Sequence, residues 1–182
     1  MAHPKPRTTP ASADTSASLI RSALHTLEAE AGGVNAIAAA LQGDLGPAFI
    51  AACDLIRDAK GRVTVTGLGK SGHVGRKIAA TLASTGTPAF FVHAAEASHG
   101  DLGMITADDV IVALSWSGET AELKNLINYS RRFRIGLIAV TSEAESTLGS
   151  AADISLTLPK TREACPHNLA PTTSALMQLA LG

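Results

Sequence analysis

The chain has 182 residues, enough for one domain with a sizeable core, and only 3% are aromatic, so the core must consist mainly of Ala, Val, Ile and Leu. Its 15 basic and 16 acidic residues give a formal net charge of -1, which gives no support to nucleic-acid binding driven by bulk charge. No apolar run approaches the roughly 18 residues of a membrane span, and the N-terminus lacks the apolar stretch of a signal peptide. We therefore expect a cytoplasmic protein with no nucleic-acid or membrane partner.

The N-terminal third is expected to be helical after a disordered leader. Residues 1–17 are rich in Pro, Ala, Ser and Thr, as disordered segments are. Apolar residues then recur at helical spacing over residues 19–41, with an interruption at the pair Gly32-Gly33. A second helix is predicted over residues 47–59, with Cys53 buried on its apolar face. Two helices that precede any strand suggest a packing layer or an oligomer arm.

From residue 62 onward, short apolar strands alternate with helices in what we expect to be a single domain over residues 18–182. The predicted strands are 63–66, 89–92, 110–114, 135–140 and 154–158. The predicted helices are 72–84, 120–132, 146–151 and a last one that begins at residue 172. This alternation is typical of an α/β fold, in which a parallel sheet is covered on both faces. Ligands of such folds bind beyond the carboxyl ends of the strands, so the loops there should carry the site.

A glycine-rich turn, residues 67–72, follows the first predicted strand. Its three glycines match the dinucleotide-binding fingerprint, but that fingerprint requires an acid at the end of the second strand, where His93 stands. A P-loop would require glycine at the position of Thr64. The glycines could simply permit a tight turn, but this leaves Lys70 and Ser71 without a role. Because the turn directs N–H groups and a helix N-terminus at one point, we interpret it as a binding site for the phosphate of a sugar.

A second turn of small residues, Ser-Trp-Ser-Gly-Glu-Thr at 115–120, follows the third predicted strand. The hydroxyls of Ser115, Ser117 and Thr120 could converge with nearby N–H groups on one phosphate. The alternative is that Ser117 or Thr120 caps the following helix. Three hydroxyls at alternating spacing favour the phosphate site.

Other polar residues remain open to more than one interpretation. Glu119 and Glu122 begin a helix, where acids often only compensate the helix dipole. Glu163 lies in a loop among basic residues, where it could be a functional group or simply a solvated carboxylate. His99 lies between small residues, where it could be an acid/base or a hydrogen-bonding ligand, or equally a packing or interface residue. Cys165 has no neighbour that favours a catalytic thiolate, and no pair of histidines or cysteines has the spacing of a metal site.

Five segments in this order resemble the sugar isomerase (SIS) domain of bacterial arabinose-5-phosphate isomerases. They are Gly-Leu-Gly-Lys-Ser-Gly-His at 67–73, Ser-Thr-Gly-Thr-Pro at 84–88, His-Gly-Asp-Leu-Gly at 99–103, Ser-Trp-Ser-Gly-Glu-Thr at 115–120 and Glu-Ala-Cys-Pro at 163–166. The resemblance covers roughly residues 19–182. It implies a three-layer αβα sandwich with a five-stranded parallel sheet of flavodoxin-like topology, preceded by two leading helices.

The resemblance also implies roles for particular residues. Phosphate binding would fall to Ser71, Ser115, Ser117 and Thr120, and catalysis to Lys70, Glu122 and Glu163, with His99 as a further catalytic candidate. The family reaction interconverts ribulose 5-phosphate and arabinose 5-phosphate, supplies the lipopolysaccharide sugar Kdo, and needs no redox cofactor or metal. Aldose–ketose exchange through an enediol requires a carboxylate to move the proton and a positive group to stabilise the oxyanion. Lys70 fits the second task, and either Glu122 or Glu163 fits the first.

The chain departs from the family at two places. Trp116 stands where a small polar residue is usual. Family members also continue past the equivalent of Gly182 with a histidine in a Ser-His-Pro-Gly-Gly segment and a pair of CBS domains, so we expect a C-terminally truncated SIS domain. The resemblance implies a homotetramer with active sites near subunit contacts, for which the leading helices and His99 are interface candidates.

Two other functions remain open besides the isomerase. The chain could be a non-catalytic sugar-phosphate sensor, or an SIS isomerase that acts on another ketose phosphate. A sensor would need only the phosphate-binding residues, so the presence of Lys70, Glu122 and Glu163 together favours an enzyme.

Overall fold

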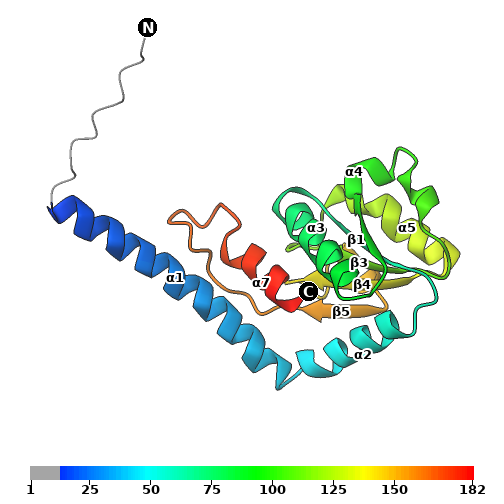
Figure 1. Cartoon of the computed structure of the whole chain (residues 1–182), viewed down its shortest axis with the longest axis horizontal. Coiled ribbons are helices and arrows are strands. Elements are labelled where there is room, and N and C mark those ends of the chain that lie inside the picture. Colours follow the sequence, from blue (N-terminus) through cyan, green and yellow to red (C-terminus); the bar gives the residue numbers. More distant parts are fainter. Residues whose placement is uncertain (1–12) are drawn as a thin grey trace, which may run out of the picture.

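Five parallel strands form the sheet around which the chain folds. A computed structural model describes residues 13–182 (Figure 1). The strands are β1 (Val63–Gly67), β2 (Ala89–His93), β3 (Val110–Leu114), β4 (Gly136–Thr141) and β5 (Ile154–Thr157). They lie in the order β2-β1-β3-β4-β5, and every neighbouring pair is parallel. Every residue of β1 and β3 is buried, as expected for central strands covered on both faces.

Helices cover both faces of this sheet and give the predicted three layers (Figure 1). One face carries α1 (Ala13–Leu41), α2 (Leu45–Arg57), α3 (Gly69–Ser84) and α7 (Thr173–Leu181). The other carries α4 (Ala94–Ala97), α5 (Lys124–Phe133) and α6 (Thr147–Ala151), with the 3-10 turns η1 (Asp101–Met104) and η2 (Ala121–Leu123). Alternate strand residues enter the two cores: Val112 and Leu114 pack on the first face, and Ile111 and Ala113 on the second. The predicted fold is confirmed.

Helix α1 differs from the prediction in two ways. It begins at Ala13, inside the segment expected to be disordered, and residues 1–12 of that leader lie outside the described residues. It also continues unbroken through the glycine pair. Gly33 is buried against α7, where an added Cβ would lie 2.6 Å from Thr173 Cγ2 and 3.0 Å from Met177 Sδ. Gly33 therefore allows close contact between α1 and α7, and it destabilises α1 by only about 1 kcal/mol relative to alanine.

The N-terminal half of α1 extends away from the sheet (Figure 1). Its apolar side chains Leu19, Ile20, Leu24 and Leu27 are exposed by 64%, 63%, 52% and 61%. They form a stripe that no other described residue covers. Within residues 13–182, no single helix has the length and hydropathy of a membrane span, and only α1 and α2 taken together, bent by 83°, pass that test.

The prediction for Cys53 is wrong, because its thiol is exposed. The apolar side of α2 is only partly covered, so Ala52 is buried while Ile50 is 62% exposed. Cys53 instead lines an apolar groove of about 360 Å³ between α2, α3 and the sheet. The loop after β2 also differs from the prediction, since it contains α4 and η1.

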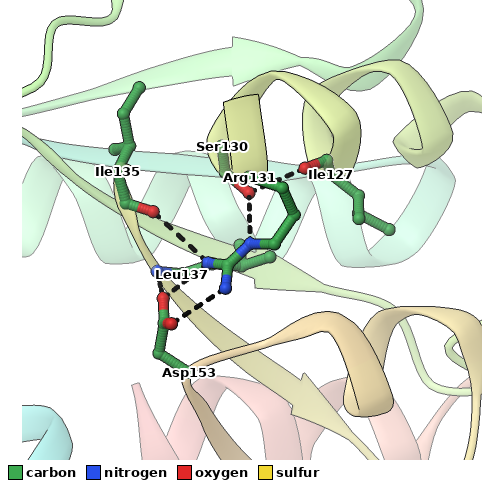
Figure 2. A network of polar contacts seen from close by, with 6 residues as sticks. All are labelled: Ile127, Ser130, Arg131, Ile135, Leu137 and Asp153. Carbon is green, nitrogen blue, oxygen red and sulfur yellow. Dashed lines mark hydrogen bonds and ion pairs between the residues drawn. The ribbon is translucent and has the colours of Figure 1, made fainter. Parts of the chain in front are cut away.

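A bidentate ion pair fastens the end of α5 to the start of β5 (Figure 2). Arg131 Nη1 and Nη2 donate to Asp153 Oδ1 and Oδ2 at 2.9 and 2.6 Å, and the amide of Leu137 donates to Asp153 Oδ2 at 2.8 Å. The hydrogen bonds from Arg131 outweigh burial and lower the pKa of Asp153. The basic run at residues 131–134 lies at an exposed helix end.

Candidate functional site

Both predicted turns lie at the carboxyl edge of the sheet, on adjacent strands. β1 and β3 are paired in register, with Gly67 opposite Leu114, so the chain leaves the sheet at two points separated by about 5 Å. From there α3 crosses one face of the sheet, while η2 and α5 cross the other. This divergence is the topological switch point at which open α/β sheets bind their ligands.

The glycines of the first turn allow β1 to run directly into α3. Gly69 has a φ of +56°, which favours glycine. An added Cβ at Gly67 would lie 3.0 Å from the backbone of Ser71, and one at Gly72 would lie 3.0 Å from the Gly67 carbonyl. Leu68 precedes the helix and offers no side-chain cap. The first amide N–H groups of α3 therefore have no capping partner and can donate to an anion.

Lys70 and Ser71 occupy different environments in this turn. The side chain of Lys70 is exposed and has no hydrogen bond or ion pair with any residue of the described chain. Ser71 is partly buried, and its Oγ donates to Gln178 Oε1 of α7 at 2.8 Å. The ammonium of Lys70 is thus available to a ligand, while Ser71 is held by a helix that lies far along the sequence.

The hydroxyls of the second turn bond to one another and to the backbone. Ser115 is 3% exposed, and its Oγ lies 2.7 Å from Thr120 Oγ1 and accepts the amide of Gly118 at 3.1 Å. Ser117 Oγ accepts the amide of Glu119 at 3.3 Å. Thr120 precedes η2 without a side-chain cap bond. The hydroxyls thus close the turn on itself, and the alternative of a simple helix cap does not describe them.

Backbone contacts fix this turn against β4 and α6. The carbonyl of Trp116 accepts the amide and the hydroxyl of Ser142, each at 2.9 Å. Gly118 has a φ of +68°, and an added Cβ there would overlap Ser146 Oγ. The carbonyl of Gly118 also accepts the amide of Leu148 at 3.0 Å. The turn is therefore a rigid part of the fold.

The two glutamates near the second turn have different surroundings. Glu119 accepts the amide and the hydroxyl of Thr147 at 2.7 Å each, and these bonds lower its pKa. Glu119 thus holds the turn to the start of α6. Glu122 is exposed and has no polar partner among residues 13–182. Of the two carboxylates, only Glu122 is free for other chemistry.

Glu163 is not the solvated loop carboxylate that the sequence left possible. Its Oε2 accepts the Thr172 amide at 2.8 Å, the Thr172 hydroxyl at 3.0 Å and the Ser174 amide at 3.2 Å. Burial raises the pKa of this carboxyl, and the hydrogen bonds from Ser174 and Thr172 outweigh that effect and lower it. Lys160, its basic neighbour in sequence, pairs instead with Glu143 at 2.6 Å. Glu163 is an ionised group that stabilises the N-terminus of α7.

Helix α7 connects Glu163 to the first turn. Ser174, which donates its amide to Glu163, and Gln178, which bonds Ser71, are four residues apart and lie on one side of the helix. Through these contacts the loop after β5 reaches the N-terminus of α3. Glu163 and Ser71 are therefore positioned by the same short helix.

His99 is not bonded to either turn. It is exposed between α4 and η1, and its amide donates to the Glu96 carbonyl at 2.8 Å. The neighbouring Ser98 accepts the side-chain amide of Asn125 at 2.9 Å, which ties this loop to α5. In the described chain, no hydrogen bond links the His99 side chain to another candidate residue.

The SIS domain family matches residues 55–182, a range that includes both turns, Glu163 and α7. This chain belongs to the SIS domain family. The resemblance seen in the sequence motifs is thereby confirmed.

Individual relatives support the same assignment. The chain is 54% identical over 163 residues to arabinose 5-phosphate isomerase KdsD of Pseudomonas aeruginosa, and 57% identical over 134 residues to that of Yersinia pestis. These alignments cover 90% and 74% of this chain but 49% and 41% of the relatives, so the chain spans about half their length. The solved structure of E. coli CFT073 c3406 in complex with arabinose 5-phosphate is 38% identical, with a TM-score of 0.83 over 90% of this chain and 85% of that one.

Two residues of this SIS domain escaped the sequence analysis. Gln178 contacts Ser71, and the available signal was a single polar residue in the apolar run Ala-Leu-Met-Gln-Leu-Ala-Leu at 175–181 of α7. Thr172 holds Glu163, and its position just before that helix was a typical N-cap signal.

Proposed function

We propose that this SIS domain belongs to an aldose–ketose isomerase that interconverts D-ribulose 5-phosphate and D-arabinose 5-phosphate. The observation that carries the proposal is the convergence of two hydroxyl-bearing turns at the sheet edge, with Glu163 linked to one of them through α7. The similarity to enzymes named arabinose 5-phosphate isomerase supports the choice of substrate.

In this proposal the phosphate lies between the two turns. It is bound by the hydroxyls of Ser71, Ser115, Ser117 and Thr120 together with the first amides of α3. The register of β1 and β3 supports this assignment, because it brings both turns to neighbouring positions. The 2.7 Å contact between Ser115 and Thr120 supports it as well, since hydroxyls that close could share one anion.

The chemistry needs one proton moved between two carbons. A carboxylate removes the proton from C2 of the aldose, the electron pair forms the C1–C2 double bond, and the C1 oxygen takes up a proton to give the enediol. The C2 hydroxyl then loses its proton as the new carbonyl forms, and C1 receives one. No electrons leave the sugar, so no redox cofactor is required.

Lys70 and two glutamates are the proposed catalytic residues. Lys70 stabilises the enediolate, because its ammonium is exposed beside the phosphate turn. Glu163 can act as the base, since it is ionised and its Oε2 is held in place by the start of α7. Glu122 is the other candidate, and it is free of polar partners within the described chain. We keep both in the proposal, with His99 as a further residue that acts near a subunit contact.

The isomerase proposal includes association into a homotetramer. Ile20, Leu24 and Leu27 of the exposed stripe continue along α1 through Ala31, Val34 and Ala38 in a heptad pattern with alternating steps of four and three, and Leu19 lies beside Ile20. A stripe of this width fits one partner helix, and a second copy of α1 supplies the same pattern. Leu24→Glu should reduce the oligomer measured by light scattering, whereas the control Ser22→Glu on the same helix should not.

The biological setting of the proposal is the supply of arabinose 5-phosphate for Kdo and lipopolysaccharide synthesis in the cytoplasm. The names of the relatives support this setting. Two alternatives remain within the same fold: a sugar-phosphate sensor without catalysis, and an isomerase for another ketose phosphate. Lys70, Glu122 and Glu163 favour an enzyme over a sensor, and a panel of ketose phosphates distinguishes the two isomerases.

The proposal is tested by mixing the protein with ribulose 5-phosphate and measuring arabinose 5-phosphate by NMR. Wild type should convert the sugar, and Lys70→Ala should lose at least 100-fold in rate, a typical loss on removal of one charge-stabilising group. Lys77→Ala is the matched control, because Lys77 is exposed on the same helix and bonds only Thr81. Binding without conversion would favour the sensor, and normal turnover by Lys70→Ala would remove the central assignment.

A further inference from the structure

Gln178 is a buried polar residue with one bonded and one unbonded end. Its side chain is 1% exposed, packed on the inner side of α7. Oε1 accepts the Ser71 hydroxyl at 2.8 Å, whereas Nε2 has no hydrogen-bond partner among the described residues. Burying two N–H donors without an acceptor is costly, so this arrangement requires an explanation.

A half turn of the Gln178 amide group explains this arrangement. The amide oxygen and nitrogen are nearly equal in size, and rotation about Cγ–Cδ exchanges their positions. With Oε1 facing Ser71, the serine gives its only proton to Gln178 and has none left for an anion. With Nε2 in that position, the amide donates to Ser71 Oγ across the same distance, and the serine proton is released. The flip leaves one N–H and the carbonyl oxygen unpaired in place of two N–H groups, and proteins tolerate an unpaired buried carbonyl oxygen more often than an unpaired buried N–H.

We propose that Gln178 is a positioning residue for phosphate binding, whose amide donates to Ser71 and thereby directs the Ser71 proton to the anion. This inference rests on the proposed function, in which Ser71 contacts the substrate phosphate. The resulting chain runs from Nε2–H to Oγ–H to a phosphate oxygen, and each bond polarises the next. Ser71 lies in the first turn of α3, whose free amides face the same anion.

The position of Gln178 on α7 defines what its loss should change. Gln178 touches Ser71 and not the carbons at which the proton moves, and the phosphate is bound equally in the ground state and the transition state. Loss of the amide should therefore raise KM and leave kcat nearly unchanged. If Gln178 only packed α7 against α3, its loss would lower stability without raising KM at constant kcat.

The test is a double-mutant cycle on the dissociation constant of arabinose 5-phosphate, measured by calorimetry. Gln178→Met keeps the length of the side chain without hydrogen bonding, and we expect binding about 3–10-fold weaker, the range for one neutral hydrogen bond. Ser71→Ala should also weaken binding, and adding Gln178→Met to it should change the constant less than about 2-fold. Gln42→Met is the matched control, because Gln42 is the other glutamine of the chain and is exposed.

Gln178→Glu provides a second variant with nearly the natural shape. Its carboxylate accepts the Ser71 proton but cannot donate, so binding should weaken at least as much as with methionine. Wild-type affinity in either Gln178 variant, or losses that simply add in the double variant, would overturn the inference. If Ser71→Ala weakens binding and the Gln178 variants do not, only the inference fails. If Ser71→Ala binds normally, the assignment of Ser71 in the proposed function fails with it.

Discussion

Replacing Glu163 with glutamine tests whether its charge holds the start of α7. The carboxylate oxygen Oε2 accepts three hydrogen bonds, two from Thr172 and one from Ser174. Glutamine keeps the shape and an acceptor oxygen but loses the charge. Hydrogen bonds to a charged group contribute about 1.5–3 kcal/mol against about 0.5–1.5 for neutral ones. Because the side chain is partly exposed, we take the low end of the difference, about 1 kcal/mol, or about 2–4 °C in Tm for a domain of this size.

The pH dependence of this loss gives a sharper test than its size. The pKa of Glu163 is lowered from its ordinary value of 4.5, so the unfolded chain binds the proton more readily than the folded one. The contribution of the carboxylate is therefore complete above pH 4.5 and is lost as the pH falls through the folded pKa. The difference in unfolding free energy between wild type and Glu163→Gln should shrink over that window.

Urea denaturation followed by circular dichroism between about pH 7 and about pH 3.5 measures this difference. Asp153→Asn is the matched control, because Arg131 also lowers the pKa of Asp153, on the other face of the sheet. Asp153→Asn should remove the part of the pH dependence of the unfolding free energy that comes from Asp153, and it should leave the part that comes from Glu163. A Glu163→Gln difference that stays constant across the range would refute the account of this carboxylate.

Three further predictions concern packing and thiol chemistry. Gly32→Ala should stabilise the protein by about 0.5–1 kcal/mol, because the added Cβ meets nothing within 4 Å. Gly33→Ala should destabilise it by about 1–3 kcal/mol, because the added Cβ contacts α7. Equal Tm shifts for the two variants would contradict this. The Thr64 hydroxyl is buried without a partner in the described chain, which destabilises the wild type by about 1 kcal/mol. Thr64→Val removes this hydroxyl and should raise Tm, and a lower Tm would refute this. Iodoacetamide followed by mass spectrometry should label Cys165 before Cys53, because backbone amides such as that of Ala170 lower the Cys165 pKa; the reverse order would contradict it.

Local patterns predicted the strands and the two turns because each depends on nearby residues. Alternation of apolar segments identified all five strands, and the glycines marked the turn before α3. Sequence could not separate Glu119 from Glu122, since the difference lies in the contact of Glu119 with Thr147, 28 positions away. Gln178 was missed for the same reason, because Ser71 is 107 positions distant.

Two errors came from local signals that tertiary contacts override. The glycine pair in α1 was interpreted as a break, but Gly33 allows α7 to approach. Cys53 follows the apolar pattern of α2, yet it lines a groove that the described residues leave open. Periodicity shows which side of a helix is apolar, and it does not show how much of that side another element covers.

We propose that this SIS domain isomerises a pentose 5-phosphate through an enediol. The most direct measurement is proton NMR of arabinose 5-phosphate incubated with the protein in D₂O. We expect the C2 proton signal of the aldose to fall as ribulose 5-phosphate appears with solvent deuterium at C1, and we expect arabinose without phosphate to stay unchanged. An unchanged arabinose 5-phosphate spectrum would contradict isomerisation through an enediol.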